Sequence, residues 1–321
     1  MITRRRFVAG AVALGAAGRA AAQAWPSKPI HLVVPYAPGG AVDTISRIVG
    51  ARISERLGQP VIVENRPGAA TNIGMQAVAK AAPDGYTLLM ASPSLATNGA
   101  LFASLPFDPA RDFAPVAKIG YAPLVVVVPA TSPYTTFAQL LAAGKAAPGK
   151  LIYGSAGNGS SGHLAGELMA GAAGVEMLHV PYKGGAQALT DLIGERLTFM
   201  PLNPVEVVGH VRSGRLRALA VASARRLPLF PDVPTASEAG LAGFEASVWW
   251  GLVGPAHLPA DVVERLNAAT QASLAEAPTR EKLAEFGAVI DTGPAAALGD
   301  FVRAETARWS RVIRAANIRP D

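Results

Sequence analysis

Hydrophobic and polar positions along the chain predict strands and helices in alternation. A short apolar run from Ile30 to Val34 has the length of a buried strand. From Gly40 to Leu57, apolar residues recur every three or four positions with polar residues between them, which predicts a helix with one buried face. Apolar runs at Val61 to Val63 and Thr87 to Met90 predict the next strands, because Pro, Gly or Asp flanks each of them. This alternation favours parallel sheets covered by helices.

The same pattern begins again at Lys150. A strand is expected from Leu151 to Tyr153, followed by a turn rich in glycine and serine and then by a helix with Leu164, Leu168 and Ala172 on one side. The remaining elements predicted in this half are strands at Val175 to Val180, Leu197 to Leu202 and Leu216 to Ala222, with helices at Ala186 to Ile193 and Val205 to Val211. The second half therefore repeats the organisation of the first.

Two extended apolar segments separate these units, at Leu124 to Val128 and Ser247 to Val253. They are either ordinary core strands or crossover strands between two lobes. The second interpretation divides the chain into one lobe of residues 25–123 plus 250–321 and another of residues 124–249. Helices predicted at Pro259 to Ala275 and Pro294 to Ile318 would complete the first lobe. The length of 321 residues also favours about two domains.

Residues 1–24 have the features of a signal peptide. A basic start at Arg4 to Arg6 precedes an apolar stretch from Phe7 to Ala17 and a small-residue exit at Ala20 to Ala22. The apolar stretch is too short to cross a bilayer, which takes about 20 residues. The segment Thr3 to Val8 fits a twin-arginine export signal, and a Sec signal is the alternative. We therefore expect a periplasmic mature protein.

Net charge and cysteine content exclude two classes of function. Loss of the leader removes four arginines and no acid, so the formal net charge falls from +6 to +2. The remaining basic residues are scattered and no basic run stands near aromatics, which argues against a nucleic-acid partner. The chain has no cysteine, so neither a disulfide nor a thiolate nucleophile or metal ligand is available.

The turn after the first predicted strand is a candidate site for an anion. It has the sequence Pro35-Tyr36-Ala37-Pro38-Gly39-Gly40 and leads into the first predicted helix. Glycine lets a ligand approach the backbone, and the unpaired N–H groups at a helix start carry partial positive charge that suits a carboxylate. The alternative is that the glycines serve only the tight turn. Asp43 is expected to satisfy these donors itself and not to touch the anion, because two negative charges would repel.

Two turns in the second half have the same placement between strand and helix. The first of them, Gly154 to Gly162, offers Ser155, Asn158, Ser160 and Ser161 as donors. Its glycines at 157, 159 and 162 match the letters of the dinucleotide fingerprint, but the acid required at the end of the following strand is missing. We therefore expect no nucleotide and no cofactor. The other turn is Pro181-Tyr182-Lys183-Gly184-Gly185-Ala186, in which Lys183 is the one cation of the three turns.

Residues suited to catalysis are few. The five histidines lack metal-ligand spacing and no G-x-S-x-G elbow is present, so we expect neither a metal site nor an enzyme. The alternative is an exported hydrolase that uses Ser160 or Ser161 with His163 and a distant acid. His163 is instead expected to pack or to hydrogen-bond in the first turn of its helix.

Several segments together resemble the Bug-type, or TctC-like, receptors of tripartite tricarboxylate transporters. The match spans nearly the whole mature chain, in the family's order and spacing. The matching segments are Trp25 to Ile30, Val34 to Gly40 with Asp43, Asn65 to Ala69, Pro83 to Leu88, His163 to Glu167, His179 to Gly185, Pro231 to Thr235 and Glu238 to Gly240.

The resemblance implies an α/β periplasmic-binding-protein fold of the Venus-flytrap type II, with a mostly parallel sheet flanked by helices in each lobe. The implied function is to bind a small carboxylate between the lobes, largely through backbone amides and ordered water, and to deliver it as a monomer to integral-membrane transporter subunits. Ser92 and Ser94 are expected to add side-chain contacts, or else to lie in a solvated loop. The expected ligand-binding residues are Tyr36, Ala37, Pro38, Gly39, Gly40, Ser92, Ser94, Ser155, Gly157, Asn158, Ser160, Ser161, Lys183, Gly184, Gly185 and Asn203, with Asp43 and His163 as structural neighbours.

One position departs from the family pattern. Relatives often have an acidic residue after the strand near Leu197 to Met200, where this chain has Asn203. Loss of that acid would relax selection for an amino group on the ligand. A di- or tricarboxylate is therefore expected in preference to an amino acid.

Overall fold

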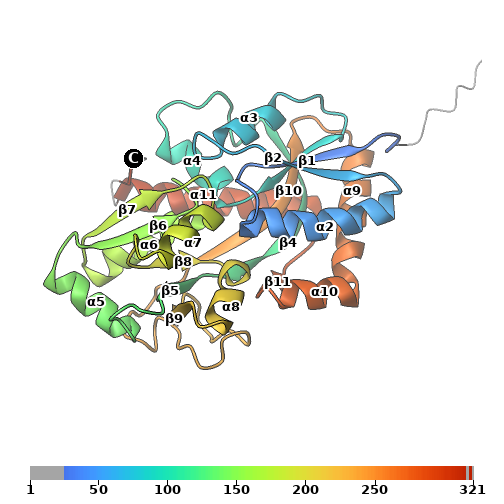
Figure 1. Cartoon of the computed structure of the whole chain (residues 1–321). Helices are drawn as coiled ribbons and strands as arrows, with labels where there is room; N and C mark the ends of the chain where they lie inside the picture. Colours follow the sequence, from blue (N-terminus) through green and yellow to red (C-terminus); the bar gives the residue numbers. More distant parts are fainter. Residues whose placement is uncertain (1–24, 316–317, 320–321) are drawn as a thin grey trace, which may run out of the picture.

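A computed structural model describes residues 25–315 and 318–319 (Figure 1). The signal peptide predicted for residues 1–24 lies outside these ranges. In the described ranges, no helix has both the length and the apolar character that crossing a membrane would require.

The first lobe is built on a six-stranded sheet whose strands lie in the order β11-β4-β10-β3-β1-β2 (Figure 1). The strands are β1 (Ile30–Val34), β2 (Val61–Asn65), β3 (Thr87–Ala91), β4 (Phe113–Pro123), β10 (Ser247–Pro255) and β11 (Val289–Ile290). The helices of this lobe are α2 (Ala41–Leu57), α3 (Asn72–Ala79), α4 (Pro93–Leu101), α9 (Ala260–Ala275), α10 (Ala277–Ala284) and α11 (Ala295–Ala315).

The second lobe contains a three-stranded sheet, β8-β5-β9, and a parallel pair, β6-β7. A single bridge between Tyr153 and Phe199 joins the two sheets. The strands are β5 (Val125–Pro129), β6 (Leu151–Ser155), β7 (Met177–Pro181), β8 (Met200–Leu202) and β9 (Leu216–Val221), and the helices are α5 (Phe137–Ala146), α6 (Ser161–Ala173), α7 (Gly185–Ile193) and α8 (Pro204–Arg212). The two-lobed α/β fold predicted from the sequence is thus confirmed.

Strand pairing is more mixed than the expected mostly parallel sheets. The pairs β1-β2, β1-β3 and β6-β7 are parallel. By contrast, β10 runs antiparallel to β3 and β4, and β5 runs antiparallel to β8 and β9. The antiparallel strands include those next to the passages between the lobes, where the chain enters a sheet from the opposite side. The parallel part of each sheet keeps the turns at strand carboxyl ends together, as the site requires.

The chain passes between the lobes twice, at Leu124 and after Ala246, and the backbone groups of Leu124, Ala222 and Ala246 hydrogen-bond to one another beside these passages. Leu124 separates β4 from β5, and its N–H donates to the carbonyl of Ala246 at 2.9 Å. Ala222 N–H donates to Leu124 at 2.8 Å, and Ala246 N–H donates to Ala222 at 3.0 Å. The strand β10 pairs with β4 from Ser247 onward, so the second passage lies just before the predicted crossover segment and not within it. On this basis we propose the lobe division at residues 123/124 and 246/247, the second three residues before the boundary expected from the sequence.

The helices α2 and α6 follow two of the three candidate turns. In α2 the predicted apolar positions Val42, Ile45, Val49 and Ile53 are buried, and Leu57 is half-buried. In α6 the predicted Leu164 is buried and Leu168 is half-buried against the core, but Ala172 is exposed; the first turns, Gly162 to Gly166, are buried. These first turns pack against β6: a Cβ on Gly166 would lie 2.2 Å from the Tyr153 ring.

Candidate ligand-binding site

Two cavities beside Tyr36 are lined by residues of both lobes, as is another of about 350 Å³ between Gly39 and the helices α7 and α8. Of the two beside Tyr36, the larger has a volume of about 420 Å³ and the smaller about 30 Å³. Tyr36 and Ala156 line both. The larger cavity has the size of a small-molecule site, whereas the smaller one, here called the inner recess, holds a water or a single polar group.

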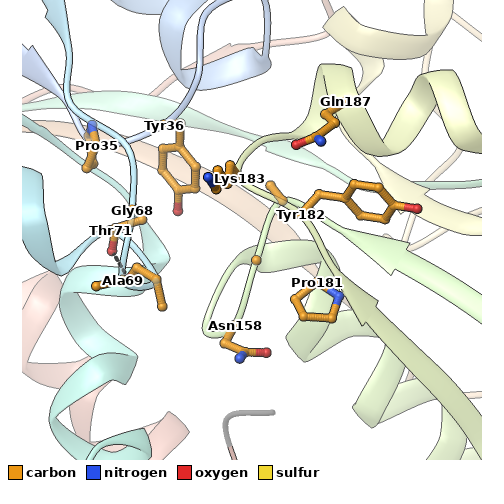
Figure 2. Close-up of a pocket in the computed structure, with 13 residues that line it drawn as sticks. Pro35, Tyr36, Gly68, Ala69, Thr71, Asn158, Pro181, Tyr182, Lys183 and Gln187 are labelled. Carbon is orange, nitrogen blue, oxygen red and sulfur yellow. Dashed lines mark hydrogen bonds between the residues drawn. The ribbon is translucent and has the colours of Figure 1, made fainter.

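Loops of both lobes form the larger cavity. The first lobe contributes Pro35 and Tyr36 from the β1–α2 turn and residues 68–71 from the β2–α3 loop. The second lobe contributes residues 156–158 and 181–183 together with Gln187. Figure 2 shows Tyr36 facing Lys183 and Asn158 across the cavity, with the Gln187 amide turned inward. The Tyr182 side chain extends away from Tyr36 and Asn158, and its hydroxyl donates to Asp191 at 2.7 Å.

The backbone amides of the β1–α2 turn do not face this cavity as predicted. Ala37 N–H donates to the carbonyl of Lys183 in the other lobe at 3.2 Å. Gly39 N–H donates to Asp43 at 3.0 Å, and the N–H of Ala41 lies near the carboxyl group of Glu206, whose pKa it acts to lower. Protein acceptors therefore occupy these helix-start donors, and they come from parts of the chain that local sequence cannot place.

Tyr36 is the side chain that this turn presents to both cavities. Its hydroxyl lies 3.1 Å from Ser92 Oγ and 2.6 Å from Ser94 Oγ, and all three side chains are buried. Burial raises the pKa of Tyr36 above its ordinary value, so the phenol stays protonated. Ser92 also lines the inner recess, whereas Ser94 serves to fix Tyr36.

Asp43 has the structural role expected of it. Besides Gly39 N–H, it accepts from Arg47 at 3.1 Å and from Asn65 at 2.9 Å. Burial alone would raise its pKa, but these hydrogen bonds outweigh burial and the pKa of Asp43 lies below its ordinary value. The carboxylate therefore stays charged and braces the first turn of α2 against β2.

Many polar groups of the β6–α6 turn hydrogen-bond within the turn and so stabilise its conformation. Ser155 Oγ bonds to both the N–H and the carbonyl of Gly157 at 3.1 Å, and lies 2.7 Å from His179 Nε2. Ser155 is thus a buried brace and does not line either cavity, contrary to expectation. Burial lowers the pKa of His179 from 6.5 to about 4, so this brace contains a neutral imidazole at physiological pH.

Ser160 and His163 form a helix cap. His163 N–H donates to Ser160 Oγ at 3.4 Å, and His163 Nδ1 accepts from Gly159 N–H at 3.1 Å. These contacts match the expected role of His163 in the first turn of its helix. They also place both residues of the alternative hydrolase in contacts with backbone groups.

The β2–α3 loop is a part of the site that the sequence analysis missed. Ala69, Ala70 and Thr71 have positive φ angles of 46°, 50° and 75°, a conformation that is uncommon outside glycine. Asn98 on α4 holds this loop by donating to Ala70 O and Asn72 Oδ1, both at 2.8 Å. The segment from Asn65 to Ala69 belongs to the family resemblance. No residue type in it indicates that three consecutive non-glycine residues adopt a left-handed backbone conformation.

The inner recess contains an acid that the sequence analysis did not assign. Its lining includes Ser160, Ser161, Gly185, Asn203 and Glu206. Asn203 Nδ2 donates to Glu206 at 2.6 Å. The expected loss of a carboxylate from this region at Asn203 is therefore wrong, because Glu206 supplies one from the first turn of α8.

The predicted residues accordingly fall into three groups. The larger cavity is lined by Tyr36, Gly157, Asn158 and Lys183, and the inner recess by Tyr36, Gly40, Ser92, Ser160, Ser161, Gly185 and Asn203. Ala37, Pro38, Gly39, Ser94, Ser155 and Gly184 line neither. Gly184 packs against Ala37 from the other lobe, and Pro38 and Gly39 are exposed at the surface.

Polar atoms without protein partners mark both cavities. Among the described residues, the buried Oδ1 atoms of Asn158 and Asn203 have no hydrogen-bond partner. Buried acceptors are normally paired, so these atoms indicate places where a water or a ligand donor would bind. The described residues contain no group of three His, Cys, Asp or Glu side chains that could hold a metal ion.

Sequence comparison identifies relatives over most of the chain. A family model described as tripartite tricarboxylate transporter family receptor matches residues 45–318. A protein of Pseudomonas sp. (strain P51), described as UPF0065 protein in tcbD-tcbE intergenic region, is 42% identical over 316 residues, which cover 97% of this chain and 94% of that protein.

Two solved structures show the same fold with ligands. R. palustris Rpa4515 with adipate has 36% sequence identity and a TM-score of 0.89, covering 92% of this chain and 100% of that one. MatC from Rhodopseudomonas palustris with bound malate has 33% identity and a TM-score of 0.85, covering 90% of this chain and 100% of that one.

Proposed function

Because the chain belongs to the tripartite tricarboxylate transporter receptor family, we propose that it is a periplasmic solute-binding protein that captures a small carboxylate between its lobes. It then delivers this ligand, as a monomer, to integral-membrane transporter subunits. The family consists of solute-binding receptors, which are not a class of enzymes.

One observation carries the ligand assignment: a cavity of about 420 Å³, built from loops of both lobes, has Lys183 as its charged residue. Among the described residues no acid lines this cavity, since Asp43 is engaged with Gly39, Arg47 and Asn65, and Glu206 lies in the inner recess. A single ammonium group in a mostly apolar and amide-lined cavity favours a carboxylate over a cation or a neutral solute.

The chemistry of the relatives refines this proposal. Rpa4515 and MatC were solved with adipate and malate, which are both dicarboxylates. A dicarboxylate with one carboxylate at Lys183 fits the larger cavity of this chain, and a tricarboxylate of similar length is the next candidate. A ligand that touches both lobes stabilises the state in which they meet, and this state would be the one that the transporter recognises.

A melting screen tests the proposal. Purified protein is heated with adipate, malate, citrate, aromatic acids, amino acids and neutral sugars, because a ligand bound only by the folded state raises the melting temperature as RT ln(1 + [L]/Kd). Native mass spectrometry of protein taken from the periplasm identifies any ligand that copurifies. The expected result is a shift with one class of carboxylates. A shift with an uncharged solute and none with any carboxylate would refute the ligand assignment.

A further inference from the structure

The carboxylate of Glu206 reaches across the cleft. Glu206 is the third residue of α8 in the second lobe, yet its carboxyl group lies at the start of α2 in the first lobe, where the N–H of Ala41 acts to lower its pKa. A Cβ on Gly40 would lie 3.3 Å from Glu206 Oε1, and the charge of Glu206 helps to raise the pKa of Tyr36. The side chain therefore belongs to one lobe and makes contacts with the other.

Two glycines make room for this carboxylate. A Cβ on Gly185 would lie 1.8 Å from Glu206 Oε1, a distance that no side chain can tolerate. Gly185 has no left-handed φ that would itself require glycine. Gly40 and Gly185, which the sequence suggested for close approach of a ligand, thus permit close approach of a protein carboxylate.

The starts of three helices surround the same carboxylate. Ala41 begins α2, Gly185 begins α7, and Asn203 caps α8 and donates to Glu206 through its side chain at 2.6 Å. The partial positive charge at helix N-termini favours an anion at such a place. Burial raises the pKa of Glu206, while the hydrogen bonds from Asn203 and Ala41 oppose that rise.

Other contacts also bridge the lobes, but they are neutral. Ala37 N–H donates to Lys183 O at 3.2 Å, and Thr97 Oγ1 donates to Gly159 O at 3.1 Å. When the lobes separate, water can replace the protein partner equally well in both of these hydrogen bonds. Glu206 differs because its carboxyl group lies against the starts of α2 and α7 in addition to the start of its own helix.

We propose that Glu206 is a positioning residue that holds the two walls of the binding cleft together by occupying the helix-start donor of α2 with the protein's own carboxylate. This inference rests on the proposed function only in so far as the cleft is the ligand site. The ligand's carboxylate is then confined to the larger cavity, near Lys183. Because contact between the lobes precedes binding, the apparent affinity for ligand is higher than it would be in an open protein.

Interlobe distances in the ligand-free protein test this role. The chain has no cysteine, so Lys145→Cys on α5 and Arg265→Cys on α9 allow one spin label on each lobe, both at exposed positions. Double electron–electron resonance then compares the parent protein with E206Q, E206A and the exposed control E281Q. We expect a short distance in the parent and in E281Q, a partial shift to longer distances in E206Q and a larger shift in E206A. Distances in E206A equal to those of the parent would overturn the proposal.

A double-mutant cycle shows whether the contact at Gly185 is the cause. G185A should lengthen the interlobe distance when Glu206 is present, because the new methyl group displaces its carboxylate, but should change little in the E206A background. G171A, a position with no atom within 4 Å of an added Cβ, is the matched control. An equal effect of G185A in both backgrounds would refute the contact. E206Q keeps the size of the side chain and supports a conclusion if E206A fails to fold.

Neither measurement uses a ligand. If no carboxylate raises the melting temperature in the screen, the interlobe distances therefore still test the role of Glu206. Conversely, unchanged distances in E206A would leave the carboxylate proposal intact.

Discussion

At the scale of single residues, the electrostatics of the cavity depend on which charged side chains are already paired with other protein groups. Lys183 is exposed at the cavity, while the nearest acids are held elsewhere, Asp43 by Arg47 and Asn65 and Glu206 by Asn203. The cavity therefore attracts an anion although the three turns together contain only one cation.

Removal of that cation tests its role. In K183M the dissociation constant of the best carboxylate found in the screen should rise at least about tenfold, since hydrogen bonds to charged groups contribute about 1.5–3 kcal/mol. Isothermal titration calorimetry gives the constant. K145M, an exposed lysine on α5, is the control and should bind as the parent does. Equal affinity of K183M and the parent would place the carboxylate elsewhere.

Acid should weaken the fold through His179. Its pKa is about 4 in the folded protein and 6.5 when unperturbed, so between these values the unfolded chain binds a proton that the folded protein does not. Stability from this residue is complete above pH 6.5 and is lost as the pH falls toward 4, by roughly 2 kcal/mol between pH 7 and pH 5. Urea unfolding of the parent and of H179Q measures it. The difference in stability between the parent and H179Q should change by roughly 2 kcal/mol from pH 7 to pH 5, and parallel curves would contradict the assignment.

At the scale of elements, the shape of the cavity depends on how α4 holds the β2–α3 loop. The loop keeps three non-glycine residues in a left-handed conformation, which costs free energy unless the surroundings fix it. Asn98 supplies that constraint through its bonds to Ala70 and Asn72. Helix α4 thus acts on the site without lining the larger cavity.

The variant N98A should loosen this loop. We expect a loss of about 1–3 kcal/mol in the free energy of unfolding, because Ala70 O and Asn72 Oδ1 lose their donor, together with weaker ligand binding. G99A on the same helix is the control, since an added Cβ there meets only Pro109 at 3.8 Å. Unchanged binding in N98A would show that the loop conformation is independent of Asn98.

Periodicity predicted the elements whose apolar residues form a clear pattern along the sequence. The strand β1 and the helix α2 are found within one residue of their predicted bounds, because β1 is a short apolar run and α2 has apolar residues every three or four positions. Helix α4 was missed, since Pro93–Leu101 is almost wholly buried and shows no polar face. Strand β4 was missed for a related reason: its residues alternate weakly and its partners β10 and β11 lie more than 100 residues further along the chain.

The candidate site was predictable as a set of turns but not as a set of contacts. Strand–glycine–helix patterns correctly located the turns at Tyr36, Asn158 and Lys183 beside one cavity. The sequence could not show that Ala37 N–H would meet Lys183 O, or that Glu206 would reach Ala41, because each contact joins residues about 150 positions apart in different lobes. The local sequence pattern identifies a backbone N–H group as a hydrogen-bond donor, whereas the tertiary structure determines which acceptor it bonds to.

At the scale of the whole molecule, the two lobes meet through two kinds of contact. The chain segments at Leu124, Ala222 and Ala246 bond to one another where the chain passes between the sheets, and this is a place where a small backbone change can reorient one lobe. The contacts at Lys183, Gly159 and Glu206 lie across the cleft and can separate. This arrangement suits a receptor whose bound and free forms differ in lobe orientation.

The most direct test of carboxylate binding between the lobes is a crystal structure of the protein with the best ligand from the screen. We predict electron density for that ligand in the larger cavity, with a carboxylate within hydrogen-bond distance of Lys183 and the ligand in contact with Tyr36. Density outside the space between the lobes, or a bound ligand whose carboxylate faces away from Lys183, would contradict the account.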